Sequence, residues 1–244
     1  MSNITYVSLS QATALQRHLN MTAHNLANST TAGYKTVNPL LESVETGFSD
    51  DDVNYVQDGG AYLDLKTGTL VPTGNTFDIA ISGNGWMAFQ LEAGDTGYSR
   101  HGRLILDVDG QLKTSSGRPI LGAGGAPITL PDDVGQDVTI STGGTITDRT
   151  GAVLGTIGVV TIEQGADMVP LGGGMYLLPE DAATPQQAAE PGLKQGFVEN
   201  SNVEAVLEMT RLIDIQRAYE NSVKLMNQDD DLRKNVIDRL GATA

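Results

Sequence analysis

The stretch that decides the fold is AVLEMTRLIDIQRAYENSVKLM, residues 205–226, whose side chains form a repeating stripe at intervals of four and three. The recurring positions are Ala205, Met209, Leu212, Gln216, Tyr219, Val223 and Met226. This heptad spacing is typical of a helix that packs along another helix. It resumes at Leu232, Val236 and Leu240, and Gly241 stands where a C-cap glycine is expected. The sequence therefore predicts one long C-terminal helix.

A second helix is predicted near the N-terminus, from about Leu9 to Asn28. Its stripe has the same spacing and consists of Ala12, Leu15, Leu19, Thr22 and Leu26. Ser201 or Asn202 is expected to cap the C-terminal helix, with the negative charge of Glu204 in its first turn. A long helix with one apolar stripe needs a partner for that stripe. We therefore expect the two terminal helices to pair as an antiparallel coiled coil.

Between the helices, from about Asn54 to Leu193, short apolar runs alternate with turn residues, and the chain holds 29 glycines. Two strand–turn–strand units are predicted, Asp78–Gln90 around Gly83-Asn84-Gly85 and Leu104–Lys113 around Asp109-Gly110. Further strands are expected at 127–130, 138–140, 145–147, 157–162 and 175–178. Residues 179–192 are rich in Ala, Pro, Glu and Gln and are interpreted as a linker.

The predicted fold class is α+β, with paired terminal helices and an inserted, mostly antiparallel β domain. We expect residues 1–34 and 200–244 to form the helical part and residues 76–178 the β domain. Residues 35–75 and 179–199 are expected to be extended connecting segments.

Composition excludes several classes of function. The formal net charge is −15, and phosphate binding needs clustered Lys and Arg, so neither nucleic acid nor an anionic membrane surface is an expected partner. An apolar run of about 18 residues, as a spanning helix requires, is absent. The first residues lack the basic and apolar regions of a signal peptide, so we expect either no export or export without cleavage. Because the chain has no cysteine, disulfides and thiol catalysis are excluded.

Candidate sites for metals and cofactors each have a simpler interpretation. Asp107–Gly110 lacks the ligand spacing of a calcium loop and is interpreted as a hairpin turn. The glycine clusters 83–85 and 122–125 lack the following helix of a dinucleotide site and are interpreted as turns. His18 and His24 are six residues apart and do not share a helix face, and Asp229–Asp231 is interpreted as a solvated helix face. We predict no catalytic, cofactor or metal site.

The end of the first helix, HNLANSTTAGYK at residues 24–35, is crowded with side chains that can bond to backbone. Gly33 permits a left-handed turn there. We expect Asn25 and Asn28 to bond to neighbouring backbone rather than to a ligand, and we expect this segment to act as an elbow between helix and β domain.

Four stretches carry a family resemblance. They are Asn25–Lys35 (NLANSTTAGYK), Gly68–Phe89 (GTLVPTGNTFDIAISGNGWMAF), Tyr98–Leu112, and Gln195–Glu220 (QGFVENSNVEAVLEMTRLIDIQRAYE). In this order they resemble the bacterial flagellar rod and hook proteins. Tyr34 and Trp86 replace other aromatic residues of the family pattern, and the acidic run Asp229–Asp231 departs from it. The opening, the length and the C-terminus are more similar to proximal-rod than to distal-rod members.

The resemblance implies a structural subunit without enzymatic activity or cofactor, exported uncleaved through the flagellar type III apparatus to the basal body in the periplasm. Its partners would be copies of itself and other proximal and distal rod subunits. The predicted assembly interface comprises Leu15, Leu19, Asn25, Leu26, Asn28, Gly33, Met209, Leu212, Gln216, Tyr219, Val223 and Met226. The alternatives are a distal-rod subunit, a cell-wall-active enzyme beside the rod, and a secreted adhesin-like β protein.

Overall fold

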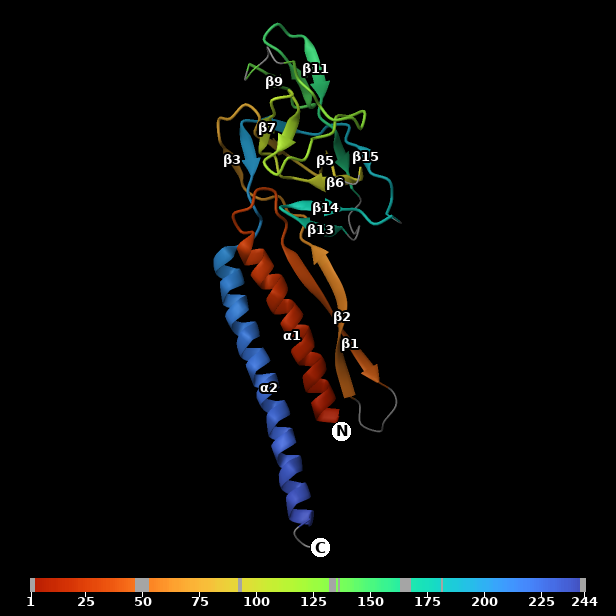
Figure 1. Ribbon diagram of the computed structural model, residues 1–244, viewed down its shortest axis with the longest axis vertical. Coiled ribbons are helices and arrows are strands. Elements are labelled where there is room, and N and C mark those ends of the chain that lie inside the picture. Colours follow the sequence, from red (N-terminus) through yellow and green to blue (C-terminus); the bar gives the residue numbers. More distant parts are fainter. Residues whose placement is uncertain are drawn as a thin grey trace. The chain divides into compact units, whose positions relative to one another are not determined.

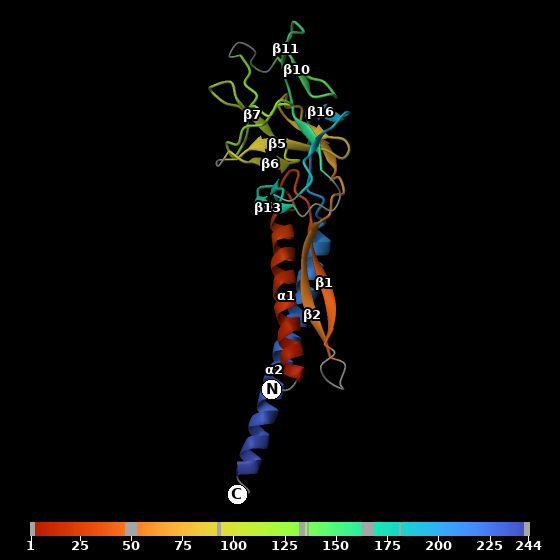
Figure 2. The ribbon, with the colours of Figure 1, turned by 90° about the vertical axis from the view of Figure 1, so that its right-hand side faces the viewer.

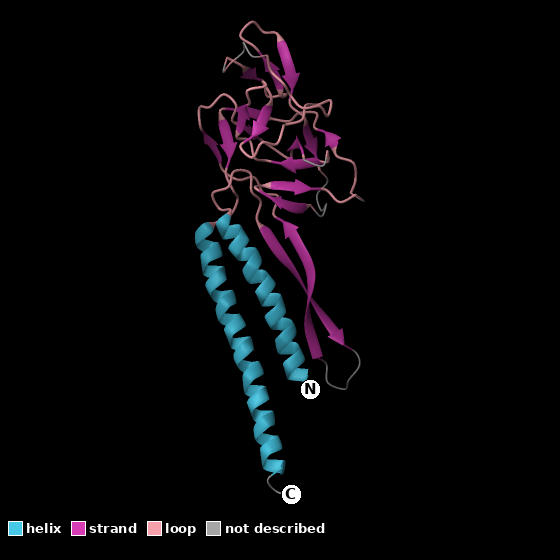
Figure 3. Ribbon diagram, viewed as in Figure 1, coloured by secondary structure: helices cyan, strands magenta, loops and turns pink. Residues whose placement is uncertain are grey.

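The computed structural model describes residues 3–46, 53–91, 94–131, 135, 137–162, 168–180 and 182–241. The chain divides into two compact units. The helical unit comprises residues 1–27, 37–63 and 204–244, and the β unit comprises residues 28–36 and 64–203. Figure 3 colours the helices of the first unit and the many short strands of the second. No helix within the described residues combines the length and apolar character needed to cross a membrane.

The helical unit is built on two long antiparallel helices, α1 (Asn3–Ala27) and α2 (Ala205–Gly241), which lie side by side (Figures 1 and 2). Strands β1 (Val37–Thr46) and β2 (Val53–Leu63) form an antiparallel hairpin in the same unit. Helix α1 contacts both α2 and this hairpin. Burial of both Ala12 and Ala14, two positions apart on α1, agrees with a helix that is covered on two sides.

Both helix boundaries differ in part from prediction. α1 begins at Asn3, six residues before the predicted start, because the stripe continues through Ser8, which is buried. α2 begins at Ala205, so neither Ser201 nor Asn202 is its cap residue. The Asn202 side chain instead bonds to Thr36 and to the carbonyls of Asp64 and Lys66.

The β unit consists of short strands whose pairings within the described residues are all antiparallel. The strands are β3 (Leu70–Pro72), β4 (Ile79–Ile81), β5 (Trp86–Gln90), β6 (Thr96–Ser99), β7 (Leu104–Leu106), β8 (Leu112–Thr114), β9 (Thr139–Ile140), β10 (Thr145–Thr147), β11 (Val153–Thr156), β12 (Val159–Thr161), β13 (Val169–Gly172), β14 (Met175–Leu177), β15 (Gln186–Gln187), β16 (Leu193–Gln195) and β17 (Phe197–Glu199). The largest sheet has the order β13-β14-β6-β5-β12-β15, and β11-β10-β9 form another. Strand pairs β16-β4, β17-β3 and β7-β8 complete the set.

A continuous apolar core fills the β unit, and its members come from β4, β5, β7, β8, β9, β10, β12, β14 and β16 and from the loops between strands. Ile79, Met87, Phe89, Leu112 and Ile146 are fully buried. Such burial contributes roughly 1.5–3 kcal/mol for each large apolar side chain. The two terminal helices in contact and the inserted antiparallel β region confirm the predicted fold class.

The strand pairings were only partly predictable. The predicted hairpin at Asp109-Gly110 is confirmed, because Leu104 pairs with Thr114 across it. The predicted pairing across residues 83–85 is wrong, since β4 pairs with β16 while β5 pairs with β6 and β12. Residues 127–130 make isolated bridges rather than a strand. The expected connecting segments contain regular structure, namely β1 to β3 within 35–75 and β15 to β17 within 179–199.

Candidate assembly surface

The seam between the two helices is unusually polar. On α2 the buried positions are Glu208, Ile215 and Ser222, seven residues apart, with half-buried Leu212 and Tyr219 between them. On α1 the corresponding stripe includes the buried residues Ser8, Ala12 and Thr22. Small and polar side chains therefore share this seam with larger apolar ones such as Ile215 and Leu212.

The predicted α2 stripe is displaced by one residue along half of its length. Met209 is 49% exposed and Gln216 is also exposed, whereas Glu208 and Ile215 are buried against α1. Because a buried Glu is rare, hydrophobic periodicity favours Met209 over Glu208. Of the other predicted interface positions, the following lie half-buried: Leu15, Leu19, Leu26, Asn28, Leu212, Tyr219, Val223 and Met226. Asn25 and Gly33 are buried.

Helix α2 exposes several large apolar side chains among more numerous polar and charged ones. Its exposed large apolar side chains are Val206, Leu207, Met209, Ile213, Leu225, Leu232, Val236, Ile237 and Leu240. We call this set the outward apolar face, although only Val206, Met209 and Ile213 lie opposite the seam; Val236, Ile237 and Leu240 continue the seam side beyond the end of α1. Isolated exposed apolar residues are common, but groups of them near both ends of one helix mark a candidate interaction surface.

Asn25 fastens α1 to the β1–β2 hairpin. Its Nδ2 donates to the carbonyl of Val37 at 2.8 Å, and its Oδ1 accepts from the amide of Val37 at 3.0 Å. This pair of bonds imitates one rung of a β ladder, and it confirms that Asn25 bonds to backbone. The Oδ1 of Asn28 accepts a bond from the hydroxyl of Thr31 at 3.1 Å.

A second contact of Asn25 reaches the seam. Its Nδ2 also lies 3.4 Å from Oε2 of Glu208, whose Oε1 accepts from Arg211 at 2.6 Å. These groups also surround His18. Burial is the main cause that lowers the pKa of His18, the positive charge of Arg211 lowers it further, and Glu208 opposes both. At the far end of the seam, Asp229 accepts from the hydroxyl of Thr5 at 2.7 Å.

The β unit holds a buried ion cluster of two cations and one carboxylate. Lys35 donates to Oε1 of Glu199 at 2.7 Å, and Arg100 donates to Oε2 at 2.9 Å. All three side chains are at most 3% exposed. Oε1 also accepts from the amide of Gly68 at 2.8 Å, so the carboxylate has donors on both oxygens. Buried charges persist only when they are paired and bonded in this way.

The cluster holds two cations and one carboxylate, and each cation also donates a hydrogen bond to a backbone carbonyl. The Lys35 ammonium donates to the carbonyl of Lys66, and Arg100 donates to the carbonyl of Gly83. The guanidinium also lies 5.6 Å from the ring centre of Trp86, a cation–π arrangement. Burial lowers the pKa of Lys35, and the carboxylate of Glu199 opposes that shift.

The backbone of Gly33 lies very close to the backbone of Arg100. It has φ +69°, and a Cβ added there would come closer than 3.0 Å to the backbone of Arg100 and His101. Its amide donates to the carbonyl of Glu199 at 2.8 Å. The next residues continue the contact, since the amide of Lys35 donates to the hydroxyl of Tyr176. Only glycine satisfies both the backbone conformation and the close approach.

Three family models match the chain. They are described as "Flagella basal body rod protein" at residues 6–35, "Flagellar hook protein FlgE/F/G D1 domain" at 80–148 and "Flagellar basal body rod FlgEFG protein C-terminal" at 194–239. The flagellar basal-body rod protein FlgF of Mesorhizobium japonicum is 36% identical and that of Caulobacter vibrioides 34%, each over 99% of both chains. The rod protein FlgG of Agrobacterium fabrum is 32% identical over 90% of this chain and 92% of its own.

The chain belongs to the flagellar basal-body rod protein family. It is a FlgF-like structural subunit of the basal-body rod and not an enzyme. Membership of the rod family implies assembly with rod subunits.

The four rod-family stretches meet at the buried ion cluster. Lys35 comes from the first stretch, Gly68 and Trp86 from the second, Arg100 from the third and Glu199 from the fourth. Sequence reasoning recognised the stretches but did not predict that their charged residues pair. Lys35 is the one charged residue of the first stretch, but the third and fourth stretches each contain several, so the sequence did not single out Arg100 or Glu199.

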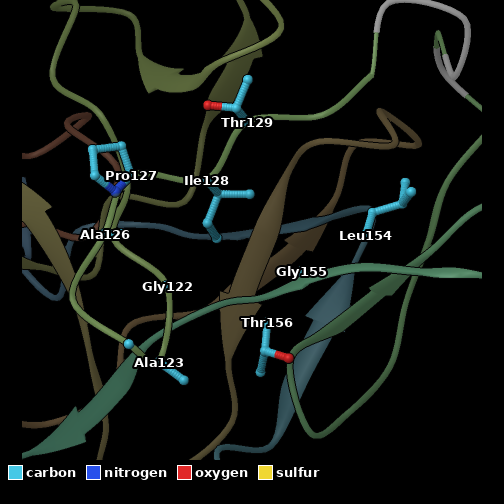
Figure 4. Close-up of a pocket in the computed structure, with 10 residues that line it drawn as sticks. Gly122, Ala123, Ala126, Pro127, Ile128, Thr129, Leu154, Gly155 and Thr156 are labelled. Carbon is cyan, nitrogen blue, oxygen red and sulfur yellow. The ribbon is translucent and has the colours of Figure 1, made fainter.

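An open groove of about 500 Å³ lies in the β unit between the 122–129 loop and β11 (Figure 4). Its lining includes Gly122, Ala123, Ile128, Leu154 and Thr156. None of the ten lining residues carries an ionisable side chain, so the groove offers no acid or base for catalysis.

Proposed function

We propose that this subunit belongs to the proximal rod and polymerises through its terminal helices into the drive shaft that transmits torque across the periplasm. Its neighbours in this proposal are copies of itself and other proximal and distal rod proteins. The proposal extends the family assignment, which gives a FlgF-like rod subunit and assembly with rod subunits.

The observation that carries the proposal is the set of large apolar side chains that α2 leaves exposed. Met209 and Ile213 lie 49–50% exposed opposite the seam, and Val236 is 55% exposed beyond the end of α1. A neighbouring subunit would bury these side chains. Repeated contacts between two different surfaces of identical subunits build an open helical assembly, which is the geometry of a rod.

The twelve predicted interface residues divide into three groups in this proposal. Met209 and Gln216 are exposed and belong to the surface between subunits. Leu15, Leu19, Leu26, Leu212, Tyr219, Val223 and Met226 are half-buried on the two helices and Asn25 is buried, so these residues support the helix pair. Asn28 and Gly33 belong to the β unit.

We also propose that the chain reaches the periplasm unfolded, through the flagellar type III export apparatus and without cleavage. The absence of cysteine supports this route, because a chain without disulfides can be unfolded and threaded without a redox step. Neither nucleic acid nor membrane insertion has a part in the proposal, in keeping with the net charge of −15.

A distal-rod subunit is the second candidate, because the FlgG protein of Agrobacterium fabrum matches most of the chain. The two candidates differ in their neighbours. Basal bodies stripped to the proximal rod would retain a proximal subunit and lose a distal one.

The test of the proposal compares two variants in a strain that lacks the native gene. Val206→Ser/Met209→Ser/Ile213→Ser removes one end of the outward apolar face, and Asn227→Ser/Gln228→Ser changes exposed polar residues of the same helix as a matched control. We expect the first variant to be exported but absent from purified basal bodies, with motility lost, and the control to swim normally. Normal motility and incorporation of the first variant would overturn the proposal.

A further inference from the structure

Two polar clusters hold the two ends of the α1–α2 seam. In the first, Glu208 accepts from Asn25 and from Arg211. In the second, Asp229 accepts from Thr5 at 2.7 Å and from Nε of Arg233 at 2.9 Å. Nη2 of Arg233 also lies 3.3 Å from the hydroxyl of Thr5. Asp229 is therefore bonded to the other helix, although its acidic run was predicted to be a solvated face.

The two clusters are matched in spacing. Glu208 and Asp229 are 21 residues apart on α2, which is three heptads, and their partners Asn25 and Thr5 are 20 residues apart on α1. In an antiparallel pair both contacts form together only in one register. A shift of either helix by a heptad breaks both clusters at once and leaves Glu208 buried without its partner from α1.

Many of the residues between the clusters are small. Ser8, Ala12, Thr22 and Ser222 are buried in the seam, beside Ile215 and the half-buried Leu15, Leu19, Leu212 and Tyr219. Small side chains fit opposite one another in several alignments, so the polar clusters add a register requirement to that of the larger side chains. Buried polar residues are the feature that fixes register in helix pairs of this kind.

We propose that Glu208 and Asp229 are the register-determining residues of the helix pair, and that they thereby set how far α2 extends beyond α1. Because Thr5 is level with Asp229, the last turns of α2 have no opposite residue on α1, and α2 continues past the N-terminal end of α1 (Figure 1). This overhang carries Val236, Ile237 and Leu240, which are 55–68% exposed. A slip of one heptad changes its length by roughly 10 Å.

The consequence for assembly rests on the proposed function. If the outward apolar face meets a neighbouring subunit, the height of that contact along the rod axis is set by the register. Subunits with mixed registers would present Val236 and Leu240 at different heights and would not build one lattice. The two polar clusters therefore stabilise the seam less than apolar residues of similar size would, but they give every subunit the same length.

The test uses the natural absence of cysteine to map the register by disulfide formation. Ala12→Cys/Ser222→Cys joins positions that are level in the observed register, and Ala12→Cys/Ile215→Cys joins positions that become level after a one-heptad slip. We expect the purified full chain to oxidise the first pair only. Introduction of Glu208→Leu/Asp229→Leu is expected to make both pairs oxidise, with helix content unchanged by circular dichroism.

The conservative variant Glu208→Gln/Asp229→Asn keeps a hydrogen-bond acceptor in each cluster and is expected to restrict oxidation to the first pair. If the double leucine variant does not fold, Asp229→Leu alone is read in the same assay. Oxidation of only the first pair in the leucine variants would overturn the inference, as would oxidation of both pairs in the parent. Slipped register with normal motility would refute the link to assembly and leave the register inference standing.

Discussion

Lys35 and Glu199 are 164 residues apart in the chain, yet their side chains form a 2.7 Å ion pair in which neither is more than 1% exposed. Arg100 approaches the other oxygen of the same carboxylate. The cluster joins a segment that follows α1 to one that precedes α2, both within the β unit. The β unit is therefore complete only when both of these distant segments are in place.

The carboxylate is the member of the cluster whose loss should cost most. Glu199→Gln leaves two buried cations without a counter-charge, and we expect it to destabilise the β unit by about 3–5 kcal/mol. Lys35→Met should cost less, because Arg100 and Glu199 remain as a neutral pair. Urea unfolding followed by Trp86 fluorescence measures this unit alone, since Trp86 is the single tryptophan and lies in it. The exposed Glu190→Gln is the control, and an equal loss there would contradict the account.

Gly33 can be tested against a glycine with the same backbone conformation and no neighbours. Gly125 has φ +76°, and an added Cβ there meets nothing within 4 Å. Gly125→Ala should cost only the left-handed penalty of about 1–2 kcal/mol. Gly33→Ala carries that penalty and also a collision with the backbone of Arg100, so the β unit should be clearly less stable than in Gly125→Ala. Equal Trp86 unfolding curves for the two variants would show that the close approach is not rigid.

The helical unit should lose stability on mild acidification. The pKa of His18 is lowered from 6.5 in the folded chain, mainly by burial and also by Arg211. Below pH 6.5 the unfolded chain therefore binds a proton that the folded chain resists, and folding becomes less favourable as the pH falls. We expect the melting temperature of the helices, followed by circular dichroism, to fall between pH 7.5 and 5.5. His18→Gln should reduce this fall and the exposed Asn20→Ala should not.

Limited proteolysis should separate the overhang of α2 from the rest of the chain. Lys234 lies in the overhang with its side chain 75% exposed, whereas Arg149 is 87% exposed but sits in a turn held by three bonds to Asp148. Because a protease needs locally unfolded chain, trypsin should cut first at Lys234 or Arg239 and later at Arg149. A first cut inside the β unit would contradict the expected order.

The sequence predicted the helix pair because heptad periodicity is a local signal that survives over many residues. The hairpin at Asp109-Gly110 was predictable for the same reason, since its turn residues specify the pairing. The pairing of β4 with β16 was not predictable, because it joins residues more than 100 positions apart and no local pattern encodes it.

The candidate site was predictable in kind but not in detail. The stripe on α2 identified the correct helix, but the seam passes through Glu208 rather than Met209. A buried carboxylate becomes acceptable only when Asn25 and Arg211 lie beside it, which depends on tertiary structure. The family stretches contain Lys35, Arg100 and Glu199, but the sequence did not predict that these residues form an ion cluster, because that also depends on tertiary structure.

The central claim, that the outward apolar face of α2 is buried between rod subunits, is tested most directly by photo-crosslinking in assembled basal bodies. A photoreactive amino acid at Ile213, which is 50% exposed, is compared with one at Ile215, which is 7% exposed and faces α1. Illumination should join the subunit to a neighbouring rod protein from position 213 and yield no intermolecular product from position 215. Incorporation of both variants into basal bodies without any product from position 213 would contradict the claim.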